Sequence, residues 1–491
     1  MRYRRVGTAL SVVALLAACG GGGSGGGDGV AGGGGPIGGT PTPPPPPPPP
    51  STTAGCSLTE RQNWVTAQMN EWYLFPETLP ANPNPSGFST VQAYLDSLTA
   101  TARSQGRDRF FTYITSIAEE NAFFNSGSSA GFGFRLTYDT GARRVFVAET
   151  FEGTTALNAG IDRGAEILAV GTSTGNLQLV SDLMAASGPQ GVINALGPND
   201  PGVTRVLRVR DVNGTTREVS ISKTDYTLTP VSSRYGAKIL DDNGKKVGYV
   251  NLRTFINTAD PALRNAFAQF KAQGVTEVIV DFRYNGGGLV SIAELMGDLL
   301  GANRSTNDVF SYTAFRPSKA QFNEQYNFQP KPQSIAPTKI AFIGTGGTAS
   351  ASELVINSFI PYLGTNMALV GTNTFGKPVG QIALDRSICD DRLRVVAFAT
   401  QNSLGQGDYF QGLAPKVPRT CQAADDITKP LGDPQEASVA RALDFLAGRS
   451  CSAIAGDGVR TQSLDRVGSP RLDLLSPDRP NTIQRDVPGS F

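Results

Sequence analysis

Three hydroxyl residues precede a predicted helix in the segment GTGGTASASELVINSF, residues 344 to 359. They are Thr348, Ser350 and Ser352, and the backbone N–H groups of a helix start can stabilise the oxyanion that forms when a serine attacks a carbonyl. Such a serine needs a base. The chain of 491 residues contains no histidine, so catalysis by Ser-His-Asp or Cys-His and metal sites built on histidine are excluded.

A lysine is the base that remains. Its pKa must fall from about 10.4 to about 7, which requires an environment that disfavours the charged form by about 4–5 kcal/mol. Lys377 lies in the segment TNTFGKPVGQIALD among aromatic, glycine and apolar neighbours, and the nearest acidic residue in sequence is Asp385. Lys377 is therefore the candidate base.

The serine also has a structural interpretation. Ser350-Ala351-Ser352-Glu353 matches a capping box, in which the serine hydroxyl accepts a bond at the helix start and the glutamate reaches back. Ser350 could be only a helix cap, and Ser352 and Thr348 are rival nucleophiles.

The elements that would position these residues follow from hydrophobic patterning. Short apolar strands alternate with amphipathic helices from about residue 247, which predicts a largely parallel sheet in an α/β core over residues 229–451. A helical region is predicted over 56–126, and short strands at 133–138, 145–149, 206–209 and 218–221 indicate a β-rich domain over 127–228. Residues 452–491 are polar with little apolar pattern, so we expect a disordered tail.

The first residues predict export. A basic start and a short apolar run over 1–18 are typical of a signal peptide, and Leu16-Ala17-Ala18-Cys19 resembles a bacterial lipobox, which predicts lipidation of Cys19. Residues 19–55, rich in glycine and then proline, would form a linker. We expect a lipid-anchored, periplasm-facing protein of a bacterial envelope, with the outer membrane as the default. A formal charge of +1 without charged blocks gives no indication of nucleic-acid binding.

Four cysteines remain after Cys19, and an even number in an exported chain indicates disulfides. Three connectivities are possible. Cys389 and Cys421 flank one segment of the core, while Cys56 and Cys451 bracket the folded region. We therefore expect the disulfides Cys389–Cys421 and Cys56–Cys451; free buried thiols are the alternative.

The motifs TASASE, FGKPVGQ and VDFRYNGGGL occur in an order that resembles the carboxy-terminal processing peptidases, also called tail-specific proteases, over about residues 58 to 450. The resemblance implies a crotonase-like α/β core with a Ser/Lys dyad. In that case Ser350 is the nucleophile, Lys377 the base and Gln381 its support, with the backbone N–H groups of Ala351 and Gly287 as oxyanion donors. Two positions depart from the family pattern, Pro378 after the lysine and Gly286 after Asn285.

The β-rich region resembles a PDZ domain, because Gly131-Phe132-Gly133-Phe134 stands where that family has its carboxylate-binding loop. Backbone N–H groups of such a loop can hold a chain terminus while the adjacent strand pairs with the peptide. The resemblance implies a serine endopeptidase without cofactor or metal, acting on proteins or peptides with accessible C-termini. Two alternatives stay open: a catalytically inactive PDZ-containing peptide-binding or scaffold lipoprotein, and a carrier of hydrophobic ligands.

Overall fold

The computed structural model describes residues 53–455 and 472–491. The predicted signal peptide 1–18, Cys19 and all but the last three residues of the predicted linker lie outside these ranges. Among the described helices, none combines the length and apolar character needed to cross a bilayer.

The core is a six-stranded mixed sheet whose order is β10-β11-β12-β15-β16-β19. All neighbours are parallel except β10 and β11. The strands are β10 (Ala237–Asp242), β11 (Lys245–Asn251), β12 (Glu277–Asp281), β15 (Lys339–Gly344), β16 (Met367–Gly371) and β19 (Thr420–Gln422). This is the mixed α/β core that the alternating pattern predicts.

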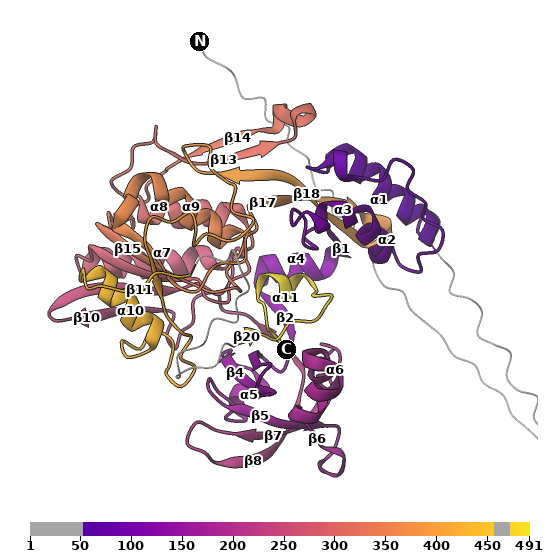
Figure 1. Cartoon of the computed structure of the whole chain (residues 1–491), viewed down its shortest axis with the longest axis horizontal. Coiled ribbons are helices and arrows are strands. Elements are labelled where there is room, and N and C mark those ends of the chain that lie inside the picture. Colours follow the sequence, from indigo (N-terminus) through magenta and orange to yellow (C-terminus); the bar gives the residue numbers. More distant parts are fainter. Residues whose placement is uncertain (1–52, 456–471) are drawn as a thin grey trace, which may run out of the picture. The chain divides into compact units, whose positions relative to one another are not determined.

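Both faces of this sheet are covered by helices (Figure 1). In β15, Ile340 and Phe342 point into the apolar cluster shared with helices α7 (Ala259–Ala272), α8 (Val290–Leu300) and α9 (Ala351–Leu363). The alternate residues Ala341 and Ile343 point into the cluster formed with α10 (Ala437–Leu446). Because side chains alternate along a strand, a sheet buried on both faces needs continuous apolar strands, as these are.

A second, five-stranded sheet carries the N-terminal helices. Its order is β1-β18-β13-β14, with β17 paired to β18. The strands are β1 (Tyr113–Ser116), β13 (Val309–Phe315), β14 (Glu324–Asn327), β17 (Val379–Arg386) and β18 (Asp391–Gln401). Val65 and Leu95, from the helices, pack with Leu393 and Val395 of β18 in one buried cluster.

Four helices and one 3-10 turn fall within the region 56–126 that is predicted to be helical. They are α1 (Leu58–Trp72), η1 (Pro76–Thr78), α2 (Val91–Leu98), α3 (Ala100–Ser104) and α4 (Ile117–Ser126). Three 3-10 turns lie later in the chain, η3 (Pro317–Phe322), η4 (Gly364–Asn366) and η5 (Ser387–Cys389). The helical pattern over 56–126 gives no indication of β1, because a four-residue strand is too short to show a period.

Residues 127–228 form the predicted β-rich region around a third sheet, of order β20-β3-β4-β5-β7-β8 with β6 paired to β5. Its strands are β3 (Phe134–Asp139), β4 (Arg144–Thr150), β5 (Glu166–Gly171), β6 (Gln178–Leu179), β7 (Thr204–Arg210), β8 (Thr216–Ser222) and β20 (Asp473–Leu474). The helices are α5 (Thr155–Asn158), the turn η2 (Thr174–Asn176) and α6 (Val180–Leu196), and β2 (Ser128–Gly131) pairs with β9 (Thr224–Thr227). Its assignment as a PDZ domain stays a prediction.

The predicted disorder of 452–491 is wrong for residues 472–491. These residues contain β20 and helix α11 (Thr482–Asp486), which lies beside α4 (Figure 1). Leu475, Val487 and Phe491 are almost fully buried. Their apolar side chains show no period in the sequence because they enter two separate clusters. Leu475 and Phe491 lie in the cluster of the β-rich sheet, and Val487 lies in another.

The predicted disulfide pairings are also wrong. The structure joins Cys56 to Cys389 and Cys421 to Cys451. Cys389 lies in η5 between β17 and β18, where Gly55, the neighbour of Cys56, also contacts it. Pairing depends on which elements become neighbours in space, and positions along the chain do not reveal this.

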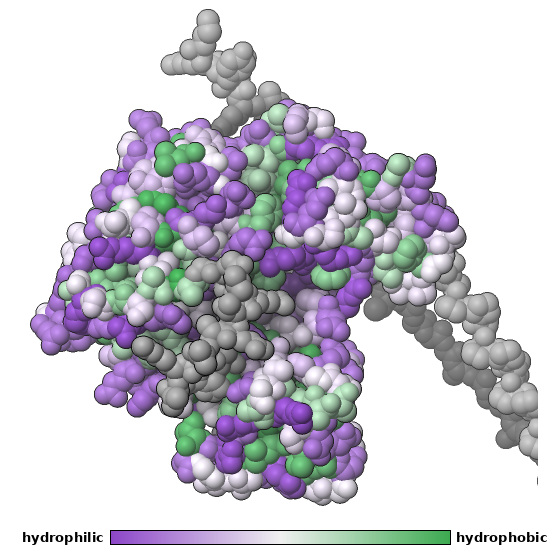
Figure 2. Space-filling model, viewed as in Figure 1, coloured by the Kyte–Doolittle hydropathy of each residue, from purple (hydrophilic) through white to green (hydrophobic). Residues whose placement is uncertain are grey.

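Hydrophilic residues cover much of the face in Figure 2, with apolar residues in scattered groups. The large apolar clusters consist of buried residues between the layers of structure.

Candidate active site

Three loops that follow neighbouring parallel strands form the candidate site. Residues 282–289 follow β12, residues 345–350 follow β15, and residues 372–378 follow β16. The carboxyl ends of parallel strands meet at one edge of a sheet, which is where α/β proteins place their ligands. The loops bring together the three motifs that the sequence separates.

Ser350 stands immediately before α9 in a strained conformation. Its backbone angles, a φ of 54° and a ψ of −114°, lie in a region that residues other than glycine rarely adopt. Such a backbone costs about 1–3 kcal/mol and persists only where the surroundings hold it, as at active sites. Ser350 is partly exposed, so its hydroxyl is the accessible one of the three candidates.

The two rival hydroxyls have structural roles. Thr348 and Ser352 are fully buried. Thr348 donates to the carbonyl of Phe282 at 2.9 Å, and Ser352 donates to the carbonyl of Asn285 at 3.1 Å. The two bonds tie the turn before α9 and the first turn of α9 to the glycine-rich loop after β12.

Glu353 connects the serine to the lysine, a role that the sequence interpretation missed. One carboxylate oxygen accepts from the backbone N–H of Ser350 at 3.0 Å and from that of Lys377 at 2.8 Å. The other accepts from the Gly376 N–H at 2.7 Å and from the Thr374 hydroxyl at 2.6 Å. The glutamate of the capping box therefore also holds the lysine loop against the start of α9.

Lys377 and Gln381 lie together as predicted. The Nζ of Lys377 donates to Oε1 of Gln381 at 2.9 Å, and Nε2 of Gln381 donates to the carbonyl of Phe111 at 2.6 Å. The bond to Phe111 fixes the amide so that its oxygen faces the amine. Nζ also lies 5.3 Å from the centroid of the Phe111 ring.

Burial lowers the pKa of Lys377 to about 8. Desolvation disfavours the ammonium form, and the carboxylate of Asp486 opposes the change. Asp486 is itself affected by burial, which raises its pKa to about 6 against the influence of Lys377. An amine with this pKa is partly neutral near pH 7 and can accept a proton.

Pro378 does not disturb the lysine. It precedes the first residue of β17, and its carbonyl accepts from the backbone N–H of Thr400 at 3.0 Å. The lysine is held by its own N–H through Glu353, so the N–H that proline lacks is not required there.

The predicted oxyanion donors lie next to each other. A Cβ added to Gly287 would come within 2.8 Å of Cβ of Ser350 and 3.2 Å of the backbone nitrogen of Ala351. Gly287 has a φ of 120°, a conformation that other residues rarely adopt. Its N–H donates to Oδ1 of Asn285 at 2.9 Å, so this bond must be exchanged before Gly287 can serve an oxyanion.

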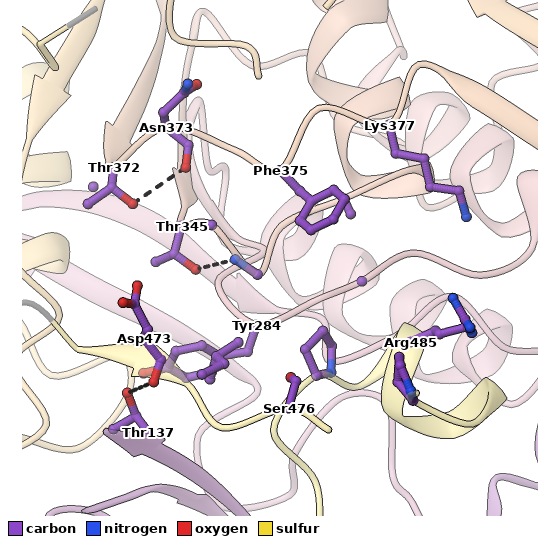
Figure 3. Close-up of a pocket in the computed structure, with 18 of the residues that line it drawn as sticks. Thr137, Tyr284, Thr345, Thr372, Asn373, Phe375, Lys377, Asp473, Ser476 and Arg485 are labelled. Atoms are coloured by element: carbon purple, nitrogen blue, oxygen red, sulfur yellow. Dashed lines mark hydrogen bonds between the residues drawn. The ribbon is translucent and has the colours of Figure 1, made fainter. Parts of the chain in front are cut away.

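A cavity of about 720 Å³ lies in front of these loops. In Figure 3 the amine of Lys377 points into it, and Arg485 of α11 lies opposite. Residues of the 472–491 segment, including Ser476, Arg485 and Asp486, line the cavity together with Lys377 and Gln381. The sequence gave no indication that this segment reaches the site.

The predicted peptide-binding residues lie at the start of β3. Phe132 and Phe134 are fully buried in the apolar cluster of the β-rich sheet. The backbone N–H of Gly133 donates to the carbonyl oxygen of Phe491 at 2.9 Å. The loop therefore holds a residue of the same chain.

Comparison with solved structures identifies the fold. A solved structure of an S41 protease from Bacteroides fragilis superposes with a TM-score of 0.60 at 24% identity, and the match covers 78% of this chain and 97% of that chain. The chain therefore has the fold of the S41 proteases.

Family models agree with the fold. The model described as Peptidase family S41 matches residues 246–416, and that of the Peptidase S41 N-terminal domain matches residues 60–113. Two segments of the chain therefore match domains of peptidase family S41.

Two curated relatives are named for C-terminal processing. A chloroplastic C-terminal processing peptidase of Tetradesmus obliquus is 29% identical over 281 residues, which cover 53% of this chain and 54% of the relative. The chloroplastic carboxyl-terminal-processing peptidase 3 of Arabidopsis thaliana is 25% identical over 358 residues, which cover 70% of this chain and 63% of the relative. The chain thus spans between about half and two thirds of their length.

Proposed function

We propose that the protein is a serine endopeptidase that cleaves exported proteins or peptides, recognised through their C-termini, with Ser350 as nucleophile and Lys377 as base. The observation that carries this proposal is the environment of Lys377. Its amine faces a cavity, bonds to a neutral amide and has a pKa of about 8, while Glu353 joins its backbone to that of the strained Ser350. The match of residues 246–416 to the Peptidase family S41 model supports the same reaction class.

In the proposed reaction, neutral Lys377 takes the proton of the Ser350 hydroxyl as the oxygen attacks the peptide carbonyl. The N–H groups of Ala351 and Gly287 bind the oxyanion. The ammonium of Lys377 then gives its proton to the leaving amine. In the second half of the reaction, neutral Lys377 takes a proton from water as the water attacks the acyl-enzyme, and the proton returns to Ser350. Gln381 is a positioning residue because it fixes the amine and touches no reacting atom.

We also propose that the protein acts outside the cytoplasm, anchored by a lipid on Cys19. The two disulfides support an oxidising compartment, where such bonds persist. Labelling with a radioactive fatty acid tests the anchor, since label should enter the wild type and be absent from Cys19→Ser.

Cleavage of casein tests the reaction. The wild type should cleave, and Ser350→Ala and Lys377→Ala should each lose at least about a thousandfold in rate, as expected when a nucleophile or its base is removed. Lys416→Ala is a matched control, because the side chain of this lysine is exposed on the surface of the same α/β region. Cleavage by either variant at the wild-type rate contradicts the dyad, and a folded wild type that binds peptides without cleaving them favours the scaffold alternative.

A further inference from the structure

The segment 489–491 lies along β3 as an added antiparallel strand. The N–H of Phe491 donates to the carbonyl of Phe134 at 3.0 Å, and the N–H groups of Gly133 and Phe134 donate back to the carbonyl oxygen of Phe491 at 2.9 and 3.4 Å. The N–H of Leu136 donates to the carbonyl of Gly489 at 2.8 Å. These bonds are the means by which a sheet edge captures an extended peptide.

The side chain of Phe491 fills a pocket in the same place. It is 2% exposed and belongs to the apolar cluster that contains Phe132 and Phe134. A Cβ added to Gly131 would lie 2.6 Å from the carbonyl carbon of Phe491, so the close approach of the two backbones depends on glycine at this position.

The same segment continues from the groove to the catalytic loops. The N–H of Gly286, next to Gly287, donates to the carbonyl of Asp486 at 2.9 Å. A Cβ at Gly286 would collide with the carbonyl oxygen of Arg485. Arg485 in turn donates to the carbonyl of Phe110 at 2.5 Å and stacks its guanidinium 4.1 Å from the ring centroid of Tyr113.

One buried arginine contacts all three parts. Nη1 of Arg135, on β3, donates to the carbonyl of Tyr284 at 2.6 Å and to that of Pro488 at 2.8 Å. Tyr284 begins the turn that leads to Gly286 and Gly287, and its φ is 65°. The strand that forms the groove, the bound segment and the proposed oxyanion loop therefore share one hydrogen-bonding side chain.

We propose that residues 131–136 form a peptide-binding groove that residues 489–491 of the same chain occupy. A substrate binds by displacing this occupant with an extended segment of its own, which places a bulky aromatic side chain in the pocket of Phe491. The proposal deepens the proposed peptidase function by naming the chemistry of its ligand. Because the occupant belongs to the same chain, its effective concentration is in the millimolar range or above, so weak ligands cannot displace it.

Peptide binding to a non-cleaving chain tests the proposal. The probe is a fluorescein-labelled peptide with the sequence of residues 482–491, TIQRDVPGSF, and its anisotropy is followed with the full chain carrying Ser350→Ala. Adding Phe491→Asp places a charge in the apolar pocket and should release the occupant. The released chain should bind the probe at least about tenfold more tightly, since burial of a phenylalanine is worth that factor or more.

Two controls define the outcome. Val212→Asp puts the same charge on a side chain of the β-rich region that is 66% exposed, and it should leave the affinity unchanged. A probe with aspartate in place of its last phenylalanine should not bind the released chain. Equal affinity of the Ser350→Ala chain with and without Phe491→Asp, or equal binding of both probes, overturns the proposal.

Phe491→Ala carries the same test if Phe491→Asp does not fold, with a gain in affinity of at least about tenfold expected again, because the same burial of the aromatic ring is lost. The readout is binding, so it is independent of the casein assay. A chain that binds as expected but never cleaves contradicts only the dyad, and a chain that cleaves without the affinity change contradicts only the occupant.

Discussion

Glu353→Gln should weaken both the fold around the site and the reaction. Each oxygen of Glu353 accepts from two donors: Ser350 and Lys377 on one side, Gly376 and Thr374 on the other. A carboxamide has nearly the same shape but replaces one oxygen by an NH2 group. The two groups that donated to that oxygen then face another hydrogen-bond donor and lose their acceptor. At about 1–3 kcal/mol for each buried unpaired group, the loss is about 2–6 kcal/mol.

Part of this loss is offset because the carboxylate is itself costly. Burial raises the pKa of Glu353, while bonds from Thr374 and from the backbone of Lys377, Gly376 and Ser350 lower it. The charge therefore depends on those four donors, and the glutamine variant removes the charge and half of its partners together.

Urea unfolding and the kinetics of casein cleavage measure the two effects. Glu119→Gln is the matched control, because Glu119 is exposed on α4 and such changes stay within about 0.5 kcal/mol. For Glu353→Gln we expect a lower urea midpoint and a kcat reduced at least about tenfold, since the amine and hydroxyl are no longer held together. A variant with the wild-type midpoint and kcat would refute the reasoning that Glu353 positions the pair.

Three further predictions concern charge and covalent links. The rate should rise with pH through about 8, because only neutral Lys377 accepts a proton and its pKa is lowered to about 8; a rise that begins near pH 10 in a pH–rate profile would contradict the buried base. Asp486→Asn should move that profile to lower pH, because the Asp486 carboxylate stabilises the ammonium and raises the pKa of Lys377; a shift to higher pH would reverse the assigned sign. Cys389→Ser removes the Cys56–Cys389 disulfide and should lower the free energy of unfolding by about 6 kcal/mol, whereas Cys451→Ser removes Cys421–Cys451 and should lower it by about 4 kcal/mol. The first disulfide closes a loop with a sequence separation of 333 residues and the second one of 30 residues, so the first restricts the unfolded chain more. A larger loss for Cys451→Ser than for Cys389→Ser in urea unfolding would count against this chain-entropy argument.

The core and the edge that carries the candidate site could be predicted from the sequence because local patterns determine them. The continuous apolar runs of β12, β15 and β16 fix the parallel sheet, and Ser350 and Lys377 lie in the loops that follow β15 and β16. Because the sequence contains no histidine, the base has to be another residue such as a lysine. Glu353 was found only as half of a capping box, because its bonds to Gly376 and Lys377 join residues more than 20 positions apart.

The 472–491 segment could not be predicted for a different reason. Phe491 is buried by Phe132 and Phe134, whereas Val487 packs with Ile483 in the cluster of Phe123 and Ile256. The apolar side chains of the segment therefore enter separate clusters, and the single pair Ile483 and Val487 is too short a pattern to show a helical period. The disulfide partners could not be predicted for the same reason, since Cys389 meets Cys56 where β17 and β18 pack against the N-terminal helices. Contacts between distant segments leave no period in a single sequence.

Covalent labelling of the nucleophile tests the central claim most directly. The full chain is treated with a fluorophosphonate that modifies activated serines, and the labelled peptide is located by mass spectrometry. We predict one modified residue, Ser350, and at least about a hundredfold slower labelling in Lys377→Ala, because the hydroxyl then lacks its base. Labelling of Ser352 or Thr348 instead, or labelling of Ser350 at the same rate without Lys377, would contradict the dyad.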